Sequence, residues 1–178
     1  MPTATPLRPR VWLPLVAGVG VAVVLGVYGR LHEPVGTTDV GGFLRLQTAK
    51  VWLATGVGIL AFVQVVSAAV IYRPRPAPGW VAGLHRWNGR LALLLSVPVA
   101  VHCLYRFGLR FDTPRVLAHS LLGCLLYGAF ATKMLLLSRP GRGSGWALPV
   151  AGGVVLTAVA GLWLTSALWF FATIGVSW

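Results

Sequence analysis

Two histidines stand inside apolar stretches of the chain, where they could act as metal ligands. His102 lies in LALLLSVPVAVHCLYRFG and His119 lies in VLAHSLLGCLLYGAFATK. Ionisable side chains inside a bilayer are costly and usually mark function. Histidines on facing helices of a bundle are a common way of holding haem iron. We therefore predict that His102 and His119 are the axial ligands of one haem b.

Three arginines and one glycine near the two histidines fit the same chemistry: Arg106, Arg110, Arg115 and Gly123. Arg106 follows His102 by one helical turn on nearly the same face, so it could neutralise a haem propionate, and the other two arginines are further candidates for that contact. Gly123 follows His119 by one turn, and a residue without Cβ leaves room for a porphyrin beside the backbone. If their helices are centred near residues 97 and 126, the histidines lie about 8 and 11 Å from the membrane midplane, on the same side.

The composition requires a membrane protein. Hydrophobic residues make up 57% of the 178 residues and charged residues only 10%, with a mean hydropathy of +0.79. This excludes an ordinary soluble domain. About 20 apolar residues cross the hydrocarbon core as a helix. We expect an all-α bundle of five transmembrane helices in one domain, residues 1–178, with spans at 11–29, 51–72, 84–107, 116–137 and 147–170.

The distribution of basic residues predicts the orientation of the bundle. If the N-terminus lies in the cytoplasm, nine Lys and Arg residues lie on the cytoplasmic side of the membrane and six on the outer side. All three acidic residues also lie on the outer side. The first span lacks a small-residue cleavage site and is longer than a typical signal-peptide core, so we expect a retained helix. These features predict a multi-pass protein of the bacterial cytoplasmic membrane with an external C-terminus. We then expect the net charge of +12 to bind anionic lipids at the membrane surface, and not nucleic acid.

Two other histidines need a simpler explanation. His85 lies 17 residues before His102 and about 100° around the helix, and no second histidine lies at its depth, so a second bis-histidine haem is disfavoured. Hydrogen bonding, or contact with a quinone headgroup, is expected for His85. His32 is first a loop residue and second an alternative axial ligand. A hydrogen-bond network of His119, Ser120 and Gln64 without any cofactor is the main alternative to haem.

Other kinds of chemistry find little support in the sequence. Cys103 and Cys124 are the only cysteines, and they are expected to be small packing residues at unequal depths. The predicted spans contain no Asp or Glu, which disfavours a cation-coupled carrier. Motifs for hydrolases, for nucleotide binding and for covalent c-type haem do not occur.

The segment LHRWNGRLALLLSVPVAVHCLYRFG, followed by RVLAHSLLGCLLYGAFATKMLLL, resembles the histidine-bearing helix pairs of transmembrane b-type cytochromes. Among these cytochromes, the helix pair most resembles those of the broad superfamily of cytochrome b-561 and ferric-reductase-like domains. With AKVWLATG and TSALWFF included, the chain also resembles uncharacterised bacterial five-span membrane proteins. The superfamily resemblance implies haem ligation, which maps here onto His102 and His119 alone.

The sequence thus predicts a b-type cytochrome-like electron-transfer protein with one haem b near the outer face. Its electrons would pass between a quinone or a membrane partner subunit and an exported redox protein. The rival hypothesis is a cofactor-free membrane subunit or scaffold that assembles with other membrane proteins through its apolar C-terminal end.

Overall fold

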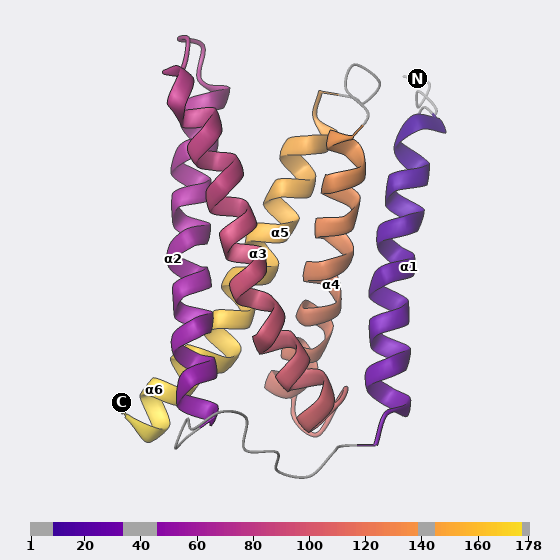
Figure 1. The fold of residues 1–178 in the computed structure, drawn as a ribbon. Coiled ribbons are helices and arrows are strands. Elements are labelled where there is room, and N and C mark those ends of the chain that lie inside the picture. The colour runs from indigo at the N-terminus through magenta and orange to yellow at the C-terminus, as the bar shows by residue number, and fades with distance from the viewer. Residues whose placement is uncertain (1–8, 34–45, 139–144, 176–178) are drawn as a thin grey trace, which may run out of the picture.

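The computed structural model of the protein describes residues 9–33, 46–138 and 145–175, which form a bundle of long helices (Figure 1). The helices are α1 (Pro9–Leu31), α2 (Leu46–Tyr72), α3 (Gly79–Phe107), α4 (Pro114–Leu137), α5 (Ala147–Trp163), the π-helix η1 (Leu164–Leu168) and α6 (Trp169–Ile174). The last three run on without a break, so α5, η1 and α6 make one long rod. The described residues contain no strand.

When α5, η1 and α6 are counted as one, the described residues contain five helices long and apolar enough to cross a membrane. This confirms the predicted all-α fold class. The third span begins at Gly79, not near Leu84 as predicted. Pro78 takes the extended N-cap position at the end of the proline-rich connection, and the Val81 N–H donates to its carbonyl at 3.0 Å. The helix therefore begins directly after the last proline, because a proline restricts the residue before it but not the one after it.

The helices pack as two groups. α3 packs mainly against α2, whereas α4 packs against both α1 and α5, and α2 joins the groups through α5 and η1 (Figure 1). That junction contains a small core of Val51, Ala167 and Phe170, with Trp163 packed against it. Because α3 and α4 each pack mainly on other helices, the sides of these two helices that face each other are left apart.

A short turn joins α3 to α4 at the end of the bundle drawn at the bottom of Figure 1, which we call the cavity end. Gly108 ends α3 with a φ of +63°, a conformation that a side chain would strain. The next N–H, of Leu109, donates to the Gly29 carbonyl of α1 at 2.6 Å. Thr113 caps α4 by accepting a hydrogen bond from the Val116 N–H at 3.3 Å. The turn is thus attached to the end of α1.

The interface of α1 with α4 depends on small residues. A Cβ on Gly18 would overlap the Thr132 hydroxyl and the Gly128 carbonyl, and a Cβ on Gly128 would lie 2.6 Å from the Gly18 carbonyl and 2.9 Å from Ala22. Backbones in a membrane gain van der Waals contact by approaching this closely, which only small side chains allow.

We expect Gly18→Leu to destabilise the protein, because the added side chain must push α1 away from α4. Overpacking of this kind costs about 1–3 kcal/mol. Gly20→Leu on the same helix is the matched control, since nothing lies within 4 Å of a Cβ there. The measurement is the melting temperature of the detergent-solubilised variants. Equal melting temperatures would contradict the packing described above.

Candidate functional site

A cavity of about 730 Å³ lies between α3 and α4 and is closed by residues of α2 and of the α5–η1–α6 rod. Its size falls in the range of ligand sites in proteins, about 300–1,000 Å³. Charged residues gather at the cavity end, where Lys50, Arg110, Asp112 and Arg115 line it. Ser96, Leu126 and Tyr127 line the deeper part. The site therefore has a mostly basic mouth and a predominantly apolar interior.

The structure brings four of the six predicted site residues to this cavity. His119, Gly123, Arg110 and Arg115 line its wall. No described atom lies within 4 Å of a Cβ built on Gly123, so there is open space beside the backbone at this point. His119 and Gly123 thus present an imidazole and a bare backbone to the same cavity, as their spacing on one helix face predicts.

The other two predicted residues, His102 and Arg106, are not among the described residues that line the cavity. The His102 ring packs edge-to-face against the Phe107 ring, with centroids 5.9 Å apart and an interplanar angle of 75°. His102 lies in the last two turns of α3 and His119 in the first two turns of α4, so the two histidines lie near the same end of the bundle. His102 lies behind the wall of the cavity and His119 in it.

A hydrogen bond from α4 to the π-helix fixes the His119 imidazole. Its Nδ1 lies 2.9 Å from Thr165 Oγ1, and this hydroxyl donates its own hydrogen to the Gly161 carbonyl at 2.7 Å. A carbonyl can only accept, so with the Thr165 hydrogen on the Gly161 carbonyl the threonine oxygen accepts from His119, and we assign the ring proton to Nδ1 on this basis. The neutral ring therefore has its lone pair on Nε2, and no hydrogen bond to Nε2 occurs among the described residues.

Such a ring is prepared for ligation. Metal-binding histidines almost always donate their second ring N–H to an oxygen acceptor, which fixes the tautomer and orients the ring. The Thr165 hydroxyl lies in the position of such an acceptor for His119. The sequence analysis did not find Thr165, although a polar Thr-Ser pair within an otherwise apolar helix is a signal that could have pointed to it.

The π-helix η1 also holds Arg115. The Arg115 guanidinium donates to the Thr165 carbonyl at 2.7 Å and lies over the Trp169 ring, 4.0 Å from its centroid. The Trp169 N–H donates to the Ser166 carbonyl, within the irregular turn of the helix. Irregular turns of this kind redirect backbone carbonyls and are frequent at functional sites. Arg115 is thus fixed at the mouth by a carbonyl and a ring and retains its full charge.

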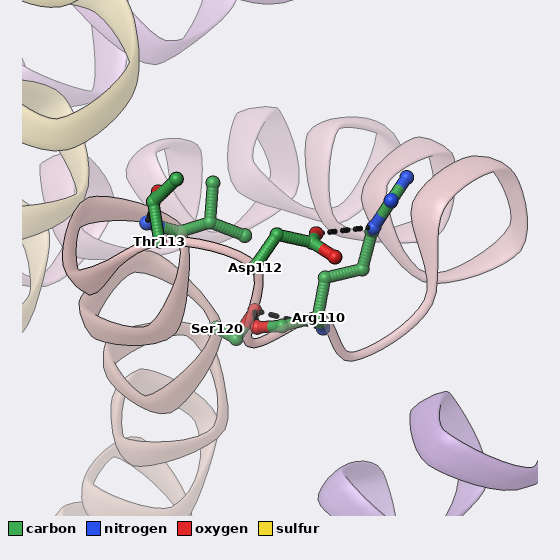
Figure 2. A network of polar contacts seen from close by, with 5 residues as sticks. Arg110, Asp112, Thr113 and Ser120 are labelled. Carbon is green, nitrogen blue, oxygen red and sulfur yellow. Dashed lines mark hydrogen bonds and ion pairs between the residues drawn. The ribbon is translucent and has the colours of Figure 1, made fainter.

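Unlike Arg115, Arg110 is held by a carboxylate and a serine hydroxyl, as Figure 2 shows. Its Nε donates to an Asp112 carboxylate oxygen at 2.7 Å, and its backbone carbonyl accepts from Ser120 Oγ at 3.1 Å. The ion pair compensates the charge of Arg110. Lys50 instead lies over the Phe107 ring, 4.9 Å from its centroid. The positive charge at the mouth therefore comes from Arg115 and Lys50 more than from Arg110.

The alternative network of His119, Ser120 and Gln64 is not formed. Ser120 bonds to Arg110, and Gln64 donates from α2 to the His85 carbonyl. The His85 Nδ1 lies 2.8 Å from the Ser67 hydroxyl, so hydrogen bonding of His85 is confirmed. Polar contacts between α2 and α3 gather instead around His85, at the end of the bundle opposite the cavity end.

The remaining candidates lie in different surroundings. His32 stacks on Tyr28 with ring centroids 5.1 Å apart and meets the Tyr105 ring edge-on at 5.0 Å, just beyond the end of α1. It is not one of the described cavity-lining residues. Cys103 and Cys124 are free thiols, and both line the cavity, where the sequence analysis expected simple packing residues.

We expect Thr165→Val to release the His119 ring, because valine cannot accept the Nδ1–H. A buried donor left without a partner costs about 1–3 kcal/mol. Thr165→Ser should retain the bond. Thr157→Val is the matched control, since this hydroxyl bonds only to its own helix at the Gly153 carbonyl. Long-range ¹⁵N NMR of labelled histidines measures the tautomer. A His119 signal unchanged by Thr165→Val would contradict the assignment.

Comparison with known proteins places the chain in a family. Residues 11–178 match DUF6529, described as a family of unknown function, and the chain belongs to this family. No curated protein and no solved structure matches the chain.

Proposed function

We propose that this member of the DUF6529 family is a b-type cytochrome-like membrane protein that binds one haem b in the cavity between α3 and α4 and takes part in electron transfer. The observation that carries the proposal is His119, which lines the cavity with its Nδ1–H bonded to Thr165 and its Nε2 lone pair free. When bound, the haem supplies an iron that changes between two oxidation states.

The residues of the cavity fit such a group. His119 Nε2 would ligate the iron, and the open space at Gly123 would admit the porphyrin edge. Arg115 and Lys50 would bind propionates at the mouth, since their charges have no carboxylate partner among the described residues. Charge-assisted hydrogen bonds from a guanidinium to a carboxylate are about twice as strong as neutral ones. Apolar side chains around the rest of the group would keep water away from it.

We further propose that the cavity end faces outward and the N-terminus lies in the cytoplasm. Support comes from the excess of basic residues at the opposite end. An exported redox protein would then exchange electrons at the mouth, and a quinone or a membrane partner subunit would supply or receive them within the bilayer.

The rival proposal is a cofactor-free membrane subunit, and it too is supported by the hydrogen bond between His119 and Thr165. The bond of His119 to Thr165 also ties α4 to η1, and interhelical hydrogen bonds of this kind stabilise membrane bundles without any ligand. In that case the purified protein is colourless and His119→Ala changes only its stability.

We expect the purified protein to show a Soret band that shifts on reduction by dithionite, as the spectrum of a bound haem does. His119→Ala should lower the haem content at least about tenfold, since loss of even an outer-shell partner weakens metal binding 10–100-fold. His85→Ala is the matched control, because His85 has the same kind of Nδ1-to-hydroxyl bond but lies outside the cavity lining. A colourless wild-type protein, purified from cells supplied with haem precursor, would refute the proposal.

Arg115→Gln tests separately whether the arginine at the mouth of the cavity binds a haem propionate. The variant keeps a hydrogen-bonding side chain but loses the charge, so haem should bind more weakly by about 1.5–3 kcal/mol, the contribution of a hydrogen bond to a charged group. Arg90→Gln is the control, because this arginine is exposed and lies over Trp87 at the other end of α3. Titration of the haem-free protein with haemin measures both affinities, and equal values would argue against a propionate contact at Arg115.

A further inference from the structure

The α3 wall of the cavity presents no imidazole. Its described residues are Ser96, Val99, Ala100, Cys103, Leu104 and Phe107. His102 neighbours Cys103 in sequence but points about 100° away around the helix, where its ring meets Phe107. The side of the cavity across from α4 therefore lacks the second histidine that the sequence predicted.

The two polar side chains in that wall are poor substitutes for a histidine ligand. Ser96 Oγ donates to the Leu93 carbonyl at 2.8 Å and pairs with the Tyr127 hydroxyl at 3.0 Å, and a neutral hydroxyl is a weaker iron ligand than an imidazole. Cys103 is a free thiol among apolar neighbours. The thiolate, and not the neutral thiol, is the metal-binding form, and a charge inside a bilayer is costly.

A second hollow lies beside this site. An apolar groove of about 620 Å³ runs between α1 and α4, and it shares two lining residues, Leu109 and Cys124, with the cavity. On the groove side, a Cβ built on Gly26 would lie 3.8 Å from Cys124 Sγ. The cavity is thus separated from the lipid side by a thin wall of apolar side chains at this point.

We propose that the haem bound through His119 keeps one axial position without a protein ligand, and that this position binds a small uncharged diatomic molecule, which reaches it from the bilayer past Leu109 and Cys124. The inference rests on the proposed function and extends it from electron transfer to ligand binding. The polarity and access of the pocket opposite the histidine decide between these two uses of a haem. An apolar wall and an apolar route are the surroundings that such a ligand requires, since dry apolar cavities take up small apolar guests.

The test uses carbon monoxide as the probe on the dithionite-reduced, haem-loaded protein. Wild type and His102→Ala should both shift their Soret band on addition of CO, because neither has a second protein ligand to displace. Ala100→Phe should weaken CO binding by about tenfold or more through filling the α3 wall, and CO binding is expressed per haem retained, with the haem content measured in parallel. Val101→Phe is the matched control, since Val101 is exposed and is not among the described cavity-lining residues.

The route is tested by the rate of CO rebinding after a light flash. Gly26→Leu should slow rebinding, because the larger side chain fills the groove beside Cys124, whereas Gly20→Leu should leave the rate unchanged. Equal rebinding rates in the two variants would overturn the route.

Two further outcomes separate the inference from the proposed function. A reduced protein that holds haem but does not respond to CO, and whose spectrum changes in His102→Ala, would overturn the open axial position and leave the haem proposal standing. A colourless protein would overturn both.

Discussion

The hydrogen bond between His119 and Thr165 is the interaction on which the chemistry of this bundle depends. It selects the tautomer of the imidazole, because the threonine hydroxyl has already given its hydrogen to the Gly161 carbonyl. It also links α4 to the irregular turn of the last rod, whose Thr165 carbonyl holds Arg115. One residue of η1, Thr165, therefore positions both the His119 imidazole and the Arg115 guanidinium. Without the π-helix, these two groups would have no common support.

The cavity itself follows from how the helices share their contacts. α4 has α1 on one side and α5 on the other, whereas α3 packs mainly against α2. Close approach of α1 and α4 is possible because Gly18 and Gly128 lack side chains. Although only residues 108–113 separate α3 from α4, these two helices are not a closely packed pair. The space between α3 and α4 is a consequence of stronger packing elsewhere, and it opens at the end where the cations gather.

The sequence predicted the elements well because a membrane constrains them strongly. Apolar length set the five spans, but α2 and α3 each begin five residues before the predicted limits of 51 and 84, and at α3 the helix begins directly after a proline. His119 and Gly123 were placed on one face of α4 by helical periodicity alone, and the structure puts both at the cavity.

The pairing of His102 with His119 could not be derived in the same way. Depth along a helix follows from the rise per residue, but rotation about the helix axis depends on which neighbour the helix packs against. Here α3 turns Cys103 toward the cavity and leaves His102 against Phe107. Thr165 and Trp169 were missed for a related reason: the polar Thr165-Ser166 pair marks the place in the sequence, but it does not show that a π-helix turns this place toward α4.

The attachment of the α3–α4 turn to α1 links the mouth of the cavity to the bilayer itself. The Leu109 N–H bonds to the Gly29 carbonyl, so the turn that carries Arg110 and Asp112 moves with the end of α1. A transmembrane helix responds to a thinner or thicker hydrocarbon layer by changing its tilt. Any such tilt of α1 displaces the turn. This single hydrogen bond therefore transmits a change in the tilt of α1 to the charged residues of the turn.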